Sequence, residues 1–181
     1  MIIAASEKVP LEKCPALVLN ADFRPLSYYP LSLWCWQDAV KSVFLEKSLI
    51  AEEKLNTFLD QVFDNLQLES NNLALVGFSQ GCMISIQVGL KRKKQINCLI
   101  GYSGKVINQK HLSDNINSKP KIFLMHGEND TIVSPTYLLE AKEYLKNHGI
   151  NTKIKMFKNC EHKIPIEGSS LGLRFLKKNL L

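Results

Sequence analysis

The amino-acid sequence predicts an α/β fold with a mostly parallel sheet covered by helices. After residue 50, short apolar runs that suit buried strands alternate with segments of helical periodicity. Such alternation is typical of parallel strands that are joined by helices. The chain has 181 residues, 45% of them hydrophobic, which is enough to fill one domain core.

The expected elements of this region follow one another in a regular order. Apolar side chains recur at helical spacing from Leu55 to Leu66. Strands are expected over residues 73–76, 98–102, 121–126 and 152–157. Further helices are expected from residue 82 and over residues 137–146 and 171–180. The polar stretch 108–119 is expected to be a loop.

The N-terminal part has a different character. Residues 15–20 are strand-like, residues 21–26 suit a turn, and the apolar spacing of residues 36–44 predicts a helix. We therefore divide the chain into an N-terminal segment, 1–48, and a main domain, 49–181, which meet near residues 47–50. We expect strand 15–20 to lie against the main sheet beside strand 73–76, and helix 36–44 to cover one face.

The most informative motif is Gly77-Phe78-Ser79-Gln80-Gly81. It lies between an apolar strand and a segment that can open a helix, and this context makes G-x-S-x-G a nucleophile elbow. The glycines permit a tight turn that lifts the serine hydroxyl clear of the sheet. Ser79 is therefore the candidate nucleophile, and the backbone N–H of Gln80 is a candidate oxyanion donor.

A serine nucleophile needs a base and a carboxylate that orients the base. Asp130 follows the strand at 121–126, and His162 follows the strand at 152–157. Parallel strand ends meet at one edge of a sheet, so Ser79, Asp130 and His162 are expected to converge there. The order serine, acid, base along the chain also suits such a site.

Other residues compete for these roles. His126 ends a strand and is interpreted as hydrogen-bonded within the turn that follows. His148 precedes Gly149 and suits the end of a helix, whereas His111 lies in the polar stretch. Glu128 and Glu161 are alternative acids, but Asp130 has the better position in its loop.

Residues 49–181 resemble the phospholipase/carboxylesterase family of α/β-hydrolases, which includes small serine esterases and acyl-protein thioesterases. The resemblance lies in residues 75–81, 99–104, 126–133 and 160–162. It implies a serine hydrolase that cleaves carboxylic esters or thioesters, with Ser79 as nucleophile, His162 as general base and acid, and Asp130 as the orienting carboxylate. No cofactor or metal is implied.

The resemblance also implies a missing part. Family members begin with several strands, one of which ends in a His-Gly loop that supplies a second oxyanion N–H, and nothing before Ser79 matches that loop. We therefore expect an N-terminally truncated α/β-hydrolase domain. Loss of one such donor lowers the rate by roughly 10²–10³-fold.

Residues 14–47 resemble the start of an HNH endonuclease-type protein, in the runs at 19–26 and 34–40. The catalytic part of such nucleases needs a metal-binding His-Asn-His constellation, often with paired cysteines. The chain has no histidine before His111 and no C-x-x-C pair. We therefore interpret Trp34 and Trp36 as a packing strip.

Charge and cysteine content restrict the function further. The net charge of +6 is spread along the chain except at residues 91–94, which we interpret as a solvated helix end; no nucleic-acid partner is expected. Five scattered cysteines suit a reducing cytosol. No apolar run is long enough to span a membrane, and Met1–Ala5 is too short for a signal peptide.

The sequence thus favours a cytoplasmic serine esterase with a small acyl-ester or thioester substrate. Two other classes remain open. One is a catalytically inactive hydrolase relic or binding module. The other is a nucleic-acid-associated protein defined by its N-terminal segment.

Overall fold

The structure is a computed structural model that describes residues 15–17, 33–67 and 72–180, with side chains described from residue 49 onward. The chain divides into two compact units, Met1–Ile50 and Ala51–Leu181. Because the second unit holds the candidate site residues, most of the description concerns it.

The first unit contains a short antiparallel pair of strands. β1 (Pro15–Leu17) pairs with β2 (Leu33–Cys35), which leads directly into the long helix α1 (Trp36–Leu66). The expectation that strand 15–20 would pair with the main sheet is therefore wrong. Antiparallel pairing with a nearby strand satisfies the same backbone groups over a short connection. Residues 18–20, the expected turn at 21–26 and the side chains of Trp34 and Trp36 lie outside the described part.

Helix α1 continues through the expected junction at 47–50 and includes both helical stripes that we expected separately. The connecting residues, from Leu45 to Lys54, contain neither glycine nor proline and are mostly strong helix formers. Local propensity therefore favours one continuous helix over two.

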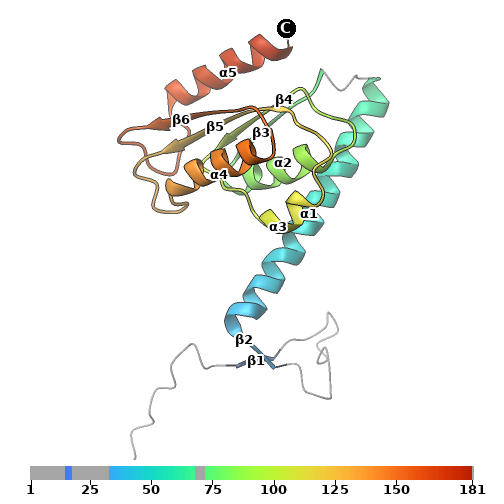
Figure 1. The fold of residues 1–181 in the computed structure, drawn as a ribbon, viewed down its shortest axis with the longest axis vertical. Helices are drawn as coiled ribbons and strands as arrows, with labels where there is room; N and C mark the ends of the chain where they lie inside the picture. The colour runs from blue at the N-terminus through green and yellow to red at the C-terminus, as the bar shows by residue number, and fades with distance from the viewer. Residues whose placement is uncertain (1–14, 18–32, 68–71, 181) are drawn as a thin grey trace, which may run out of the picture. The chain divides into compact units, whose positions relative to one another are not determined.

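The second unit is built on a four-stranded parallel sheet, as the sequence predicts (Figure 1). Its strands lie in chain order: β3 (Ala74–Phe78), β4 (Cys98–Tyr102), β5 (Lys121–Gly127) and β6 (Thr152–Phe157). Phe78 pairs with Tyr102, which pairs with Met125, so the carboxyl ends of β3, β4 and β5 are nearly level. β5 pairs with β6 through Gly127 and Phe157, the last residue of each.

Helices cover both faces of this sheet. α2 (Gln80–Lys91) and α4 (Thr136–Asn147) lie on one face and α5 (Ile166–Leu180) on the other (Figure 1). A large apolar core fills the first interface, with Ile86, Leu99 and Leu145 completely buried. A smaller core lies under α5, where the Phe123 and Phe175 rings are 5.4 Å apart.

The stretch 108–119 is not entirely a loop as expected. It contains the short helix α3 (Gln109–Ser113), which includes His111. Leu112 is completely buried in the large core, and the Tyr144 hydroxyl of α4 donates to the carbonyl of Gln109 over 3.0 Å. The buried side chain of Leu112 therefore holds the otherwise polar helix α3 against the core.

Residues 91–94 match the solvated helix end that we expected only in part, because Lys93 and Lys94 are exposed whereas Lys91 and Arg92 are not. The guanidinium of Arg92 is buried and donates to the carboxylate of Asp60 over 2.6 Å and to Asn56 Oδ1 over 2.9 Å. Lys91 forms an ion pair with Glu52. These basic side chains join α2 to the part of α1 that lies in the second unit.

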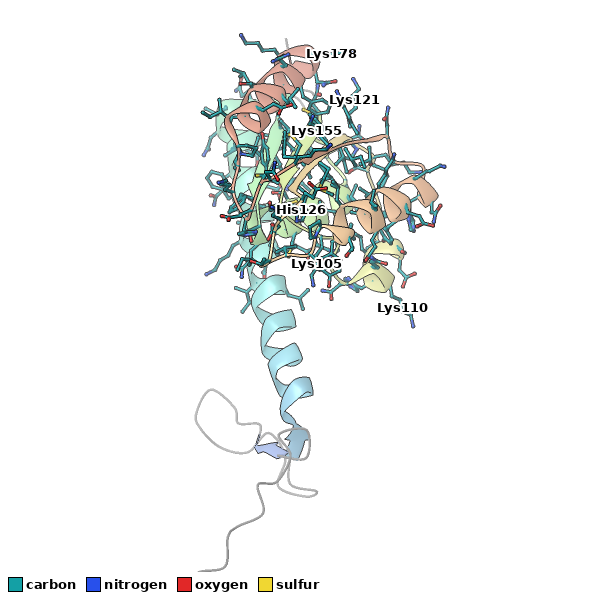
Figure 2. The ribbon with its side chains drawn as sticks, turned by 90° about the vertical axis from the view of Figure 1, so that its left-hand side faces the viewer. Lys105, Lys110, Lys121, His126, Lys155 and Lys178 are labelled. Carbon is teal, nitrogen blue, oxygen red and sulfur yellow. The ribbon has the colours of Figure 1, made fainter. Side chains whose placement is uncertain are left out.

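The other lysines of the second unit are distributed over its surface (Figure 2). Lys110 in α3 and Lys178 in α5 lie at opposite ends of it, and His126 lies between them (Figure 2). Among the helices that the structure describes, none has the length and apolar character needed to cross a membrane.

We predict that Arg92→Met lowers the free energy of unfolding by roughly 1.5–3 kcal/mol, because it removes charge-assisted hydrogen bonds that join α1 to α2. Chemical denaturation measures this. Lys94→Met is the matched control, since Arg92 and Lys94 both lie over the Phe63 ring, at 5.5 and 5.7 Å from its centroid. Lys94 pairs with Asp64 at 3.6 Å on the exposed surface, where such pairs contribute about 0–1 kcal/mol. Equal losses in both variants would contradict the role given to Arg92.

Candidate active site

Ser79 occupies the sharp turn between β3 and α2. Its backbone has φ 54° and ψ −118°, a conformation that non-glycine residues rarely adopt. The turn is held by the Ser79 N–H, which donates to the carbonyl of Tyr102 over 2.8 Å. Strain of this kind at a residue with a nucleophilic side chain is typical of functional sites.

Gly77 makes this turn sterically accessible. A Cβ atom at Gly77 would collide with the backbone of Gly81 and Cys82. A Cβ atom at Gly81, by contrast, would meet no described atom within 4 Å. The close approach of β3 and α2 therefore requires a glycine at position 77, the first glycine of the motif, but not at position 81.

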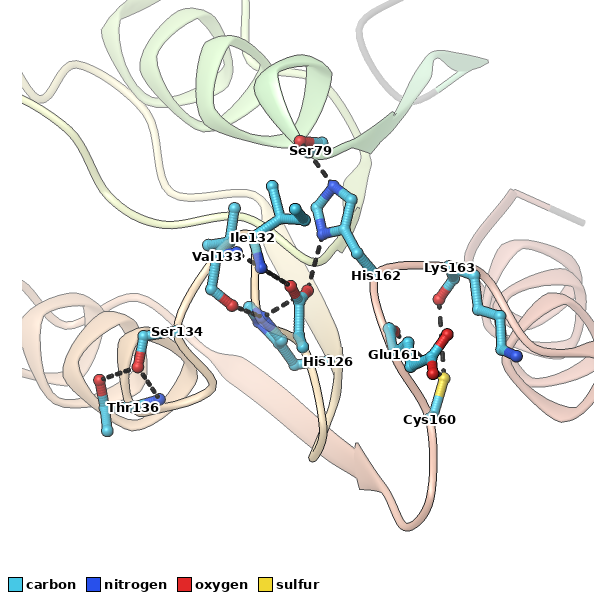
Figure 3. Close-up of polar contacts among 11 residues, drawn as sticks. Ser79, His126, Ile132, Val133, Ser134, Thr136, Cys160, Glu161, His162 and Lys163 are labelled. Atoms are coloured by element: carbon cyan, nitrogen blue, oxygen red, sulfur yellow. Dashed lines mark hydrogen bonds and ion pairs between the residues drawn. The ribbon is translucent and has the colours of Figure 1, made fainter.

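Asp130 lies in the loop after β5, which we call the acid loop (residues 128–135). Its Oδ1 accepts hydrogen bonds from the backbone N–H groups of Ile132 and Val133, each over 2.9 Å (Figure 3). Its side chain is fully buried. Burial raises the pKa of Asp130, but hydrogen bonds from Val133, His162 and Ile132 outweigh this effect, so the pKa lies below its ordinary value.

His162 lies in the loop after β6, which we call the base loop (residues 158–165). Its Nδ1 is 2.7 Å from Asp130 Oδ2, and its Nε2 is 3.1 Å from Ser79 Oγ (Figure 3). An ionised carboxylate only accepts hydrogen bonds, so Nδ1 carries the proton and the neutral ring has a free lone pair on Nε2. The Phe78 ring packs against the imidazole, with centroids 4.8 Å apart.

Backbone contacts hold the acid and base loops together. Glu128 N–H donates to the carbonyl of Phe157, and Asn129 N–H donates to the carbonyl of Cys160, each over 2.9 Å. A Cβ atom at Gly127 would collide with the carbonyls of Cys160 and Glu161. Direct packing of one backbone on another therefore sets how closely the end of β5 approaches the base loop.

The structure thus brings Ser79, Asp130 and His162 together, while the competing residues lie in other contacts. His148 follows α4, and its Nδ1 is 2.8 Å from the carbonyl of Tyr144. His126 Nε2 is 2.9 Å from the carbonyl of Val133, as its position in the turn suggested. In the described part of the chain, the carboxylate hydrogen-bonded to His162 belongs to Asp130 rather than to Glu128 or Glu161.

One contact was missed by sequence reasoning: His126 Nε2 also lies 3.2 Å from Asp130 Oδ2. The four-residue spacing of these residues in His126-Gly127-Glu128-Asn129-Asp130 was a usable signal, because the loop folds back on the end of β5.

Gln80 is the first residue of α2, so its N–H belongs to the helical turn that lacks intrahelical acceptors and suits a developing oxyanion. Residues 20–24, which follow the strand-like run in the N-terminal segment and would be the first place to seek a second backbone donor, lie outside the described residues. Residues with described side chains include no group of three or more His, Cys, Asp or Glu arranged to hold a metal ion.

We predict that Gly77→Ala lowers the free energy of unfolding by about 1–3 kcal/mol, because the new methyl group meets backbone that cannot move independently. Gly81→Ala is the matched control and is expected to leave stability unchanged or slightly raised, since alanine favours helix. Thermal and chemical unfolding of both variants measures the difference. A neutral Gly77→Ala would show that the elbow is less tightly packed than described.

The lowered pKa of Asp130 predicts a pH-dependent contribution to stability. A carboxylate with a depressed folded-state pKa stabilises the fold at pH values above its unfolded-state pKa of about 3.9, and this contribution is lost as pH falls through the folded-state pKa. The difference in unfolding free energy between wild type and Asp130→Asn should therefore shrink as pH is lowered from 7 towards 3. Asp64→Asn gives the background for an exposed carboxylate. A difference that is constant over this range would contradict the assignment.

Sequence comparison finds relatives of this chain among known proteins. The chain is 28% identical over 137 residues to acyl-protein thioesterase 1 of Aspergillus fumigatus, covering 72% of this chain and 56% of that protein. It is 22% identical over 155 residues to the Kluyveromyces lactis acyl-protein thioesterase 1, covering 82% of this chain and 68% of that protein. The chain thus spans little more than half the length of the first of these relatives.

Solved structures show the same fold. Esterase PE8 matches with a TM-score of 0.71 and 28% identity, over 74% of this chain and 62% of that one. Arabidopsis thaliana SOBER1 matches with a TM-score of 0.69 and 22% identity, over 74% of this chain and 65% of that one. The main domain therefore has the α/β-hydrolase fold that the sequence predicts.

A sequence profile described as Phospholipase/Carboxylesterase matches residues 4–180. This match includes residues 14–47, so the resemblance of that segment to HNH endonuclease-type proteins gains no support from it. With the profile matching nearly the whole chain, the protein belongs to the phospholipase/carboxylesterase family.

Proposed function

We propose that this protein is a serine hydrolase that cleaves carboxylic esters or thioesters through an acyl-enzyme on Ser79. The observation that carries the proposal is the continuous series of hydrogen bonds from Ser79 Oγ through His162 to Asp130, with lengths of 3.1 and 2.7 Å. This arrangement can remove a proton from the serine hydroxyl and stabilise the imidazolium that results.

The reaction proceeds in two halves. Ser79 Oγ bonds to the substrate carbonyl carbon while its proton passes to His162 Nε2, and the Gln80 N–H stabilises the oxyanion. The intermediate collapses, and the departing alcohol or thiol takes the proton from His162. Water then attacks the acyl-enzyme, again with His162 as base, and the carboxylic acid leaves as Ser79 regains its proton.

The surroundings of the site support an apolar acyl group as part of the substrate. Each of the three proposed catalytic residues has an exposed apolar neighbour close in sequence. Phe78 precedes Ser79, Ile132 follows Asp130 by two residues, and Ile164 follows His162 by two, with exposed fractions of 37%, 72% and 40%. Exposed apolar residues that gather at a site favour apolar ligands. The names of the thioesterase relatives agree with an acyl substrate.

The organisation of the chain is part of the proposal. Residues 1–48 form a separate segment and residues 49–181 carry the chemistry, in a cytoplasmic protein without a nucleic-acid partner. The described cysteines, Cys82, Cys98 and Cys160, are free and buried, which suits a reducing compartment. Sequencing across residues 47–50 tests whether the two parts are genuinely joined.

A fluorophosphonate probe tests the nucleophile. We predict that the probe labels wild type at Ser79 and that Ser79→Ala is unlabelled, because the probe reacts with the serine that His162 activates. Ser103→Ala is the matched control: Ser103 also has a positive φ of 46° at the end of a strand, and its buried Oγ has no partner among the described atoms. Labelling that survives Ser79→Ala, or an unlabelled wild type, would reject the proposal and favour an inactive relic.

The rate of ester hydrolysis depends on whether a second backbone N–H donates to the oxyanion. With Gln80 N–H alone, we predict measurable hydrolysis of p-nitrophenyl acetate, whose good leaving group demands less oxyanion stabilisation. Unactivated long-chain esters should be cleaved roughly 10²–10³-fold more slowly than by a family member that has two oxyanion donors. Steady-state kinetics with Ser79→Ala as background measure both. Equal rates on the unactivated ester would assign a second donor to the N-terminal segment, with the turn at 20–24 as the first candidate.

A further inference from the structure

His126 is a buried titratable residue that the proposed mechanism does not use. It is 1% exposed at the end of β5, and its Nε2 faces two acceptors, the carbonyl of Val133 at 2.9 Å and Asp130 Oδ2 at 3.2 Å (Figure 3). Neither acceptor can donate, because one is a carbonyl and the other a carboxylate, so Nε2 carries a proton. It donates this proton to the carbonyl of Val133 and lies at ion-pair distance from the carboxylate of Asp130.

The Nδ1 side of the His126 ring lowers the stability of the fold. Nδ1 is buried and has no hydrogen-bond partner among the described atoms, and a buried polar atom without a partner costs free energy. The residues before it in β5, Leu124 and Met125, are apolar and buried. An apolar side chain would therefore suit this position better for packing alone, and such local exceptions cluster at functional sites.

The contacts of His126 connect it to Asp130, both directly and through Val133. Val133 donates its N–H to Asp130 Oδ1 and accepts from His126 at its carbonyl, while His126 also reaches Asp130 Oδ2. With Ile132 N–H on Oδ1 and His162 Nδ1 on Oδ2, the Asp130 carboxylate accepts hydrogen bonds from three donors, and His126 Nε2 lies beside Oδ2. The carboxylate cannot rotate without breaking contacts on both oxygens.

We propose that His126 is a positioning residue that acts through Asp130: it fixes the carboxylate and the acid loop so that Oδ2 stays aimed at His162 Nδ1. The inference rests on the proposed function, because a fixed Asp130 carboxylate affects catalysis only if the His162 ring must be aligned with Ser79. Misplacement of a reacting group by about 1 Å costs on the order of 100-fold in rate.

Two substitutions separate positioning from packing. His126→Leu fills the space without a donor, whereas the side-chain amide of His126→Gln places an N–H near the position of Nε2. We expect His126→Leu to keep or gain thermal stability and to lower kcat for p-nitrophenyl acetate about 10–100-fold with KM little changed. His126→Gln should recover most of the rate. If His126→Leu does not fold, His126→Phe, which keeps a planar ring, replaces it.

A second measurement does not depend on turnover. The proton between His162 Nδ1 and Asp130 should give a low-field proton resonance in wild type and in His126→Gln, and a broadened or missing one in the apolar variants. Full kcat together with an unchanged resonance in the apolar variants would overturn the positioning role, as would equal losses in the Gln and apolar variants. If wild type fails to react with the fluorophosphonate probe, the proposed function falls, and the resonance alone then decides the role of His126.

Discussion

The parallel pairing of β3 to β6 is the constraint on which the site depends. Each strand runs in the same direction, so the segments that follow β3, β5 and β6 all leave the sheet at one edge. Three side chains separated by long stretches of sequence are thereby brought within hydrogen-bond distance. The helices that cover the faces bury β4 and nearly all of β5, and this burial protects the register of the two central strands from slippage.

Within that frame, the site is kept in shape by backbone contacts more than by side chains. The Ser79 turn is held by the carbonyl of Tyr102 on the neighbouring strand, and the acid and base loops are hydrogen-bonded to each other. Asp130 adds its own contacts to the backbone N–H groups of Ile132 and Val133. Such preorganisation lowers the cost of aligning charged groups at the moment of reaction.

The sequence was informative where a local signal and the global fold agreed. Strand 98–102 and strand 152–157 were predicted with the observed bounds, and the residues after the strands led directly to Asp130 and His162. The fold class and the family were also predicted. The start of α5 was missed by five residues, because its first turn is polar and glycine-containing and shows little periodicity.

The features that sequence reasoning missed depend on contacts between distant residues. The burial of Arg92 requires Asp60 and Asn56 on another helix, and the helical turn at Gln109–Ser113 requires the core around Leu112. The pairing of β1 with β2 depends on which partner strand is nearer, and a run of apolar residues does not specify its partner. The contact between His126 and Asp130 is similar, since it exists only once the acid loop has folded back.

Gly127 has a broader consequence. With no side chain at Gly127, the end of β5 meets the Cys160 and Glu161 carbonyls of the base loop backbone to backbone, and no side-chain size sets the spacing at this point. Substitutions that repack the sheet or the helices can therefore accumulate while this spacing stays constant. The chemistry of the site and the composition of the core are in this sense free to evolve independently, and a relative with a different interior can keep the same arrangement of carboxylate and imidazole.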